Sequence, residues 1–381
     1  MVASGFVVLF TCVGALLARN TPAGSPYSYL TIFSNVIHLV DSNYVEDVDF
    51  NKVMDSSMYG MIESLDSESY FIAGKDIESY KKSMESLPAM AGVGLTLSRR
   101  LGMVIVVAVE ADSSAEASKI KAGDFIRGIN DQYVQGIPLH KVNQLMKGEP
   151  GTQVKISVFR GATEKPEEFV LTRKSVTRPY SESYVAQPRI GYIGIRHLFP
   201  GVETEVGKKL EVFRNQGVQK MILDVRGCTE EDQETAVKVA DLFVPSVPIV
   251  QISGREGVVK TITGDAETQF SGELLVLIDY TTAGGAEIVA SAIQDSGAGK
   301  AFGIRSFGRG GIQKLLPAGE NFVVLTTQKY VTPKGKSILS NGIEPAIPFK
   351  EDAKSIDQTE GEDRLLNKAI EHLRHLEEKA A

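Results

Sequence analysis

The chain has 381 residues, of which 43% are hydrophobic and 23% are charged, and its formal net charge is −7. This length suits two or three globular domains of ordinary composition. The negative charge, without any basic stripe, excludes nucleic acid as a partner. The two cysteines, Cys12 and Cys228, predict no intrachain disulfide. The five histidines lack metal-ligand spacing, so we expect neither a metal nor another cofactor.

The N-terminal segment contains an uninterrupted apolar run, Gly5–Ala18. The run fits a signal-peptide core better than a membrane span, which needs about 20 residues. Counting from Val2 lengthens it, so an uncleaved anchor in the inner membrane is the alternative. Both interpretations predict an exported chain, in the periplasm or at the cell surface. We assign residues 1–27 to this segment and a Pro/Gly/Ser-rich linker.

Two helical patterns follow, and we assign residues 28–90 to an N-terminal helical segment. The first pattern runs through Ile32, Val36 and Val40, and the second through Met54 and Met58.

Residues 91–176 resemble a PDZ domain. Gly92, Val93, Gly94 and Leu95 match its carboxylate-binding loop, whose backbone N–H groups can bind the C-terminal carboxylate of a peptide. The next strand would pair with the peptide by strand addition. A flanking helix would line the groove with Leu139, Val142 and Met146. The alternative is a packing turn beside an empty groove. Arg99, just beyond the loop, favours acidic ligands or lies at a solvated hairpin tip.

Residues 177–350 predict an α/β core. Apolar runs such as Ile190–Ile195, Met221–Val225 and Leu274–Ile278 have the length of buried strands, and helical patterns alternate with them. Such alternation is typical of a mostly parallel sheet. A charged amphipathic helix is expected within 351–381.

Two motifs in this core carry a family resemblance. The first is Thr282-Ala283-Gly284-Gly285-Ala286-Glu287-Ile288, and the second is Phe307-Gly308-Arg309-Gly310-Gly311-Ile312-Gln313. They resemble the S-A-S-A-S-E-I and F-G-K-G-x-x-Q motifs of the carboxy-terminal processing peptidases. That family implies a Ser–Lys serine peptidase with an inserted PDZ domain, a mostly parallel core, and an N-terminal segment that oligomerises or gates the enzyme. A plain helical cap is the alternative for that segment.

The resemblance places the nucleophilic serine on Gly284 and the base lysine on Arg309. Glycine has no side chain to attack with, and arginine stays protonated, so both dyad groups are missing. Gln313, which the family uses beside the lysine, is retained. The family's N-P-G-G oxyanion loop is replaced by Gly227, Cys228, Thr229, Glu230 and Glu231, which places carboxylates where donors are needed.

These losses favour a catalytically inactive peptidase homologue that binds C-terminal tails, or a protein partner, through its PDZ groove. One alternative is an active endopeptidase with substitute groups. Cys228 is the best substitute nucleophile, while we expect Thr282 to cap a helix and Ser306 to be structural. The other alternative is a structural subunit of an envelope complex. An oligomer is compatible with all three hypotheses, and membrane contact is expected only through the N-terminal segment.

Overall fold

The computed structural model describes residues 28–86, 91–100, 102–160, 165–175, 180–264, 267–350 and 363–378. The predicted signal peptide or anchor, within residues 1–27, lies outside these residues. None of the helices that are described is long and apolar enough to cross a membrane. The chain divides into two compact units, Met1–Ser57 and Met58–Ala381.

The first unit contains the helix α2, Ser28–Asn43. None of its residues is buried, and Tyr29, Leu30 and Leu39 are exposed. Helix α3, Phe50–Glu63, crosses the boundary between the units. Both helices correspond to the two predicted helical patterns.

The second unit continues with short elements that the sequence did not predict: β1 (Tyr70–Ile72), η1 (Gly74–Asp76) and α4 (Ile77–Ser86). A separate sheet follows with strand order β2-β3-β4-β6-β7, and β5 pairs with β4. All of its pairs are antiparallel, and β2 lies at an edge. Its elements are β2 (Leu95–Arg100), β3 (Met103–Val109), α5 (Ser114–Ala117), β4 (Phe125–Ile129), β5 (Gln132–Tyr133), α6 (Leu139–Met146), β6 (Gln153–Phe159) and β7 (Glu167–Thr172).

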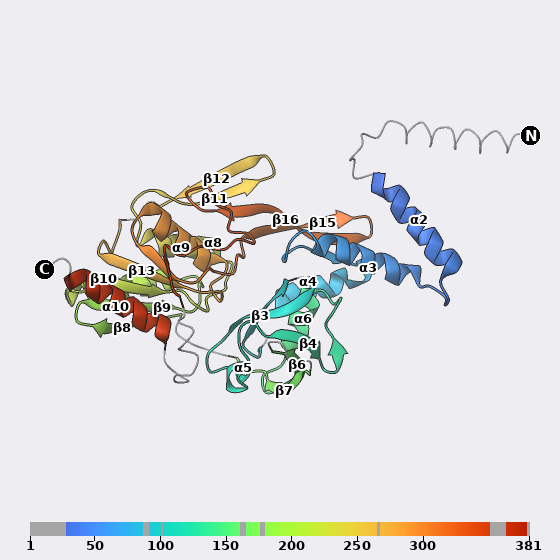
Figure 1. Cartoon of the computed structure of the whole chain (residues 1–381), viewed down its shortest axis with the longest axis horizontal. Helices are drawn as coiled ribbons and strands as arrows, with labels where there is room; N and C mark the ends of the chain where they lie inside the picture. Colours follow the sequence, from blue (N-terminus) through green and yellow to red (C-terminus); the bar gives the residue numbers. More distant parts are fainter. Residues whose placement is uncertain are drawn as a thin grey trace, which may run out of the picture. The chain divides into compact units, whose positions relative to one another are not determined.

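A second six-stranded sheet forms the α/β core, with strand order β17-β14-β13-β10-β9-β8 (Figure 1). Its central strands are parallel, and only β8 runs antiparallel to its neighbour. Helices α7, α8 and α9 pack on one face and α10 packs on the other. The elements are β8 (Ser181–Gln187), β9 (Ile190–Ile195), α7 (Val202–Asn215), β10 (Lys220–Asp224), α8 (Gln233–Asp241), β13 (Glu273–Ile278), α9 (Gly285–Ser296), β14 (Lys300–Gly303), β17 (Ile347–Pro348) and α10 (Arg364–Glu378).

Strands β9, β10 and β13 are buried on both faces, apart from Glu273, which explains their nearly continuous apolar sequences. Their carboxyl ends meet at one edge of the sheet, where Asp224 lies opposite Leu277. The loops that follow β10 and β13 therefore come together, as in other open α/β sheets.

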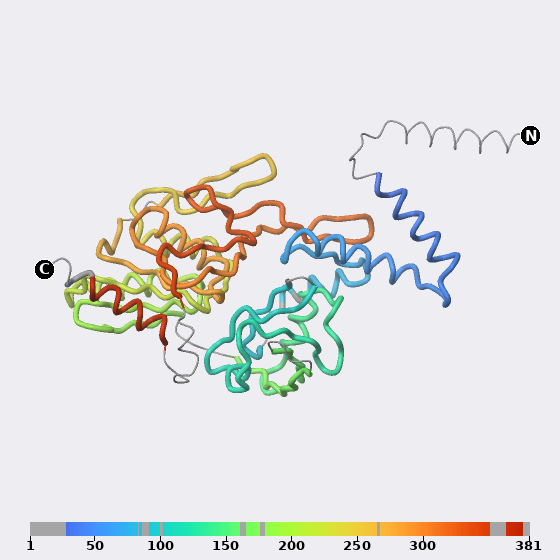
Figure 2. The backbone as a smooth tube through the Cα atoms, in the orientation of Figure 1, coloured from blue at the N-terminus to red at the C-terminus, as the bar shows by residue number. Residues whose placement is uncertain are grey.

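A third sheet is antiparallel throughout and contains β11 (Pro248–Gly254), β12 (Gly257–Thr263), β15 (Gly311–Ala318) and β16 (Asn321–Val331), with β1. Strand β16 connects β1 to β11, and with β15 it forms the extended orange hairpin in Figure 2. The fold is thus mixed α/β. The predicted mostly parallel pairing is too broad, because it holds only for the sheet that contains β10 and β13.

Candidate active site and peptide groove

The turn between β13 and α9 carries the predicted nucleophile position. Strand β13 ends at Ile278 and α9 begins at Gly285, so Gly284 is the residue that enters the helix. Its backbone has φ 63° and ψ −124°, which a residue with a side chain rarely adopts. Glycine at this position therefore relieves backbone strain as well as removing the nucleophile.

The loop Gly227–Glu231 lies directly against this turn. The N–H of Gly285 donates to the carbonyl oxygen of Glu230 at 2.7 Å, and the N–H of Ala283 donates to the carbonyl oxygen of Cys228 at 3.0 Å. A Cβ atom on Gly284 would lie only 2.5 Å from the Glu230 carbonyl oxygen. The loop therefore fills the space of a side chain at Gly284. It also uses an N–H group that this helix N-terminus would otherwise offer to an oxyanion.

Glu287, which is fully buried, connects the two predicted dyad positions. Its carboxylate accepts hydrogen bonds from the N–H groups of Gly284 (3.1 Å), Gly308 (2.8 Å) and Arg309 (2.8 Å), and from the Ser306 hydroxyl. Burial raises the pKa of Glu287 to about 7, although these four donors oppose the shift. The structure thus brings the predicted nucleophile and base positions together, and it gives Ser306 a structural role.

The guanidinium of Arg309 bridges the core and the PDZ sheet. It donates to the carbonyl oxygen of Leu97 on β2 at 3.2 Å and to that of Thr229 at 3.5 Å. Its Nε lies 3.6 Å from the carboxylate of Glu231, and the side chain is only 12% exposed. Arg309 therefore donates hydrogen bonds to several groups at once here, and it cannot accept a proton.

Gln313 contacts Glu68, a residue that the sequence analysis did not single out. The Gln313 amide and the N–H of Gly311 donate to one Glu68 carboxylate oxygen at 2.8 Å and 2.9 Å. Burial raises the pKa of Glu68 to about 7, while the nearby Arg309 lowers it. No sequence motif marks Glu68, because it precedes β1 and reaches Gln313 only through the pairing of β1 with β16.

The prediction that the Glu230 carboxylate faces an oxyanion is wrong, because other groups already bind this carboxylate. It lies 2.7 Å from Nδ1 of His197 and accepts a hydrogen bond from the Cys228 thiol at 3.3 Å. The Glu230 backbone carbonyl group, not its carboxylate, occupies the space beside Gly284. Burial, together with the Glu230 charge, raises the pKa of Cys228 well above its usual range, and the thiol is fully buried. Both facts argue against a cysteine nucleophile.

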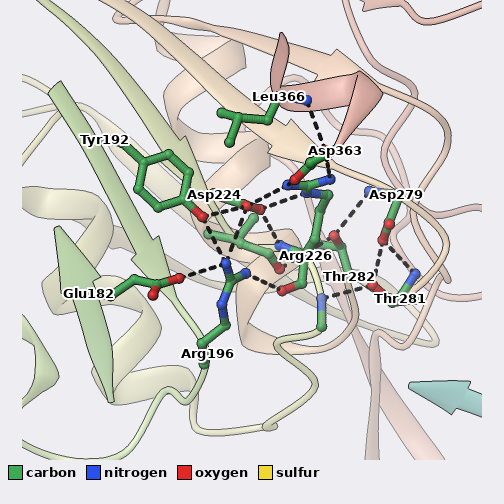
Figure 3. Close-up of polar contacts among 12 residues, drawn as sticks. Glu182, Tyr192, Arg196, Asp224, Arg226, Asp279, Thr281, Thr282, Asp363 and Leu366 are labelled. Carbon is green, nitrogen blue, oxygen red and sulfur yellow. Dashed lines mark hydrogen bonds and ion pairs between the residues drawn. The ribbon is translucent and has the colours of Figure 1, made fainter. Parts of the chain in front are cut away.

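The Thr282 hydroxyl is also engaged and buried, with the N–H of Asp279 donating to it at 3.1 Å (Figure 3). It donates in turn to the carbonyl oxygen of Val225 at 3.4 Å. Gly284 precedes the helix, so the prediction that Thr282 caps it is wrong.

A charge network lies at the carboxyl end of β10, just before the loop Gly227–Glu231 in the sequence (Figure 3). Asp224, fully buried at the end of β10, accepts two hydrogen bonds from the Arg226 guanidinium at 2.9 Å and 2.7 Å. Burial alone would raise the pKa of Asp224, but Arg226 and Arg196 hold it below its usual range. Arg226 also binds Asp363 at 3.0 Å and 2.6 Å, and Asp363 accepts the N–H of Leu366 at the start of α10. This network anchors the C-terminal helix to the core.

A cavity of about 970 Å³ opens between the PDZ sheet and the core. Its walls include the predicted carboxylate loop Gly92–Leu95, Met146 and Lys147 from the end of α6, and Glu230 from the core. Leu139 and Val142 do not line it, contrary to the prediction, because they pack within the PDZ core. Arg99 is buried and pairs with Glu63 at 3.3 Å, so it is neither a solvated tip nor part of this cavity.

Both domains of this chain match known protein families. The Peptidase family S41 model matches residues 189–349, and a PDZ domain model matches residues 90–168. The chain is 28% identical over 351 residues to the carboxy-terminal-processing protease of Bartonella bacilliformis, covering 89% of this chain and 80% of that protein. Together these matches support the carboxy-terminal processing peptidase family for this chain. They agree with the resemblance carried by the Glu287 and Gln313 motifs.

Two further similarities extend the comparison. The carboxy-terminal processing protease CtpB of Bacillus subtilis is 28% identical over 319 residues, which cover 82% of this chain and 66% of that protein. The solved photosystem II D1 C-terminal processing protease superposes with a TM-score of 0.70 at 23% identity, over 84% of this chain and 86% of that one. The latter similarity concerns the fold alone.

Proposed function

We propose that this chain is a catalytically silent carboxy-terminal processing peptidase that binds the C-terminal tails of proteins in its PDZ groove. Its relatives are named as carboxy-terminal processing proteases, which supports a role that involves protein C-termini. The observation that carries the inactivity is the packing of the Glu230 carbonyl group against Gly284.

The inactivity rests on three separate chemical losses. Gly284 supplies no nucleophile, and Arg309 supplies no base because its guanidinium stays charged. The Gly285 N–H, which could stabilise an oxyanion, is already bonded to Glu230. Each loss alone typically costs orders of magnitude in rate.

No observation favours an active endopeptidase with substitute groups. The Cys228 thiol is buried and its pKa is raised, and the Thr282 hydroxyl is buried and hydrogen-bonded. A third hypothesis, a structural subunit with an unused groove, is separated from our proposal by a binding measurement.

The peptide-binding half of the proposal rests on the loop Gly92–Leu95. Gly94 has φ 80°, and a Cβ atom there would lie 2.1 Å from Cβ of Ser113, so the loop depends on glycine. Among the described residues, the N–H groups of Val93 and Gly94 find no hydrogen-bond acceptor. Two open donors beside the cavity are suited to a carboxylate.

The test compares matched peptides on the full chain. A peptide with an apolar last residue should bind as the free acid and more weakly as the amide, which lacks the charge and an acceptor oxygen. Single-groove affinities of this kind are about micromolar. Equal binding of acid and amide would show an unused groove and favour the structural-subunit hypothesis.

The activity test uses an unfolded casein-like substrate and a tail-exposed protein, neither of which should be cleaved above a buffer control. Cleavage that disappears in Cys228→Ala or Thr282→Ala would overturn the proposed inactivity. Export of the chain, predicted from residues 5–18, remains part of the proposal and is testable by fractionating cells.

A further inference from the structure

The PDZ edge strand β2 presents its two faces to different surroundings. Side chains alternate along a strand. Leu95 and Leu97 face the PDZ interior, where they pack with its apolar core. Thr96 faces the peptidase core, because its hydroxyl lies 3.1 Å from that of Thr229. Ser98, only 2% exposed, continues this second face.

In a tail that pairs with β2, the side chains would also point alternately toward the PDZ interior and toward the peptidase core. Its carboxylate would lie at the loop Gly92–Leu95, so its last residue would lie opposite Leu95, and antiparallel pairing then fixes the others. The penultimate residue would lie opposite Thr96, the third-last opposite Leu97, and the fourth-last opposite Ser98. Directly opposed residues share a face of the sheet. The penultimate and fourth-last side chains therefore point toward the peptidase core.

Arg309 lies at the free edge of β2 and is hydrogen-bonded to the Leu97 carbonyl oxygen, the acceptor that a bound tail would need. Its guanidinium donates to the Leu97 carbonyl oxygen, which an added strand would take for its own N–H. Arg309 would then keep longer contacts, among them 3.5 Å to the Thr229 carbonyl oxygen, 3.6 Å to Glu231 and 5.8 Å to the Phe307 ring. A nearly buried guanidinium that loses a partner needs a replacement.

We propose that Arg309 selects tails with an aspartate or glutamate at the penultimate or fourth-last position. This inference rests on the proposed tail-binding function. An acidic side chain on the core-facing side of the tail would accept the hydrogen bond that Arg309 gives up when it releases the Leu97 carbonyl oxygen. The third-last side chain points toward the PDZ interior, so an acid there would gain nothing. Glu231 competes directly for the same guanidinium, and Glu68 attracts it at longer range.

The experiment measures anisotropy of labelled peptides with the full chain. One apolar-ended tail is made with glutamate or glutamine at the second, third or fourth position from its end. Glutamate should bind about ten-fold more tightly than glutamine at the second or fourth position, as expected for a charge-assisted hydrogen bond. At the third position the two peptides should bind equally.

Two variants assign the effect to Arg309. Arg309→Gln should remove the advantage of glutamate while the glutamine peptides still bind, and Glu231→Gln should keep or widen it. The inference is overturned if glutamate and glutamine tails bind equally at every position, or if the advantage survives in Arg309→Gln. Failure of the proposed function looks different, because free-acid tails would then bind no better than amides, and the inference would fall with it.

Discussion

Restoring the dyad alone should not restore an enzyme, and the structure indicates why. Gly284→Ser with Arg309→Lys returns a hydroxyl and a titratable amine. The new Cβ atom, however, would lie 2.5 Å from the Glu230 carbonyl oxygen and 3.4 Å from that of Thr229. Real Cβ atoms do not approach a backbone oxygen as closely as the first of these distances, so the loop Gly227–Glu231 must move or the turn must deform.

The cost can be estimated from two contributions. A side chain at φ 63° and ψ −124° costs about 1–3 kcal/mol in backbone strain. Forcing a tightly packed contact apart costs a further 1–3 kcal/mol or so. We therefore expect Gly284→Ser to lower the free energy of unfolding by roughly 2–6 kcal/mol, against a typical total of about 5–15 kcal/mol. Gly284→Ala is the matched control and should lose a similar amount, because the clash belongs to Cβ.

The catalytic outcome is measured with one tail-exposed substrate. The double mutant should stay near background, because the loop Gly227–Glu231, even when displaced, still crowds the Gly285 N–H and supplies no donor of its own, and loss of one oxyanion donor costs about 100- to 1,000-fold in rate. Activity should appear only when Gly227–Glu231 is also rebuilt as the family-like Asn-Asn-Pro-Gly-Gly. Robust turnover by the double mutant would refute the assignment of the obstruction to this loop.

Three further predictions concern stability and reactivity. Burial, together with the charge of Lys141, lowers the pKa of His140 to about 4. The unfolded chain therefore binds a proton at this histidine more readily than the folded chain does. The free energy of unfolding should be highest above pH 6.5 and should be lower by about 2 kcal/mol at pH 5. His140→Phe should flatten this dependence in denaturant titrations, and an unchanged slope would contradict the assignment. Asp363→Ala removes a helix cap and a partly exposed ion pair and should cost about 1–3 kcal/mol, whereas Asp363→Asn, which keeps the cap, should cost less. In a Cys12→Ser background, Cys228 should react with iodoacetamide only after unfolding, and rapid labelling of the native chain would show that its burial is wrong.

The sequence correctly predicted the elements whose local hydrophobic pattern agrees with their burial in the fold. Continuous apolar runs identified β9, β10 and β13, and the glycine-rich loop before β2 correctly indicated one wall of the cavity. The same logic failed for β1, β12 and β15. All three belong to the antiparallel sheet around β16. Strands β12 and β15 are mostly exposed and so lack an apolar pattern, while β1 has only three residues and pairs with a strand far along the chain.

Some features of the candidate site could likewise be predicted from the sequence, and others could not. The motif alignment placed Gly284 and Arg309 in the sequence, and the Glu287 hydrogen bonds bring their backbones together. Residue type could not show which part of Glu230 faces Gly284, because this depends on the backbone path of one loop. Glu68 and His197 were missed since each reaches the site from a separate element, through contacts that leave no spacing in the sequence.

The three replacements at the former dyad depend on one another physically. Without a side chain at Gly284, the Glu230 carbonyl can approach the turn, and there the Gly285 N–H satisfies it. The neighbouring Thr229 carbonyl and the Leu97 carbonyl of β2 also need donors, and the Arg309 guanidinium reaches both. Arginine offers five N–H donors in a rigid fork, whereas lysine would concentrate its donors at one point. A lysine at this position could hold one of these carbonyl groups but would serve the second poorly. Arg309→Lys in the otherwise unchanged chain should therefore weaken the contact between β2 and the core, and faster hydrogen exchange at the β2 amides would report it.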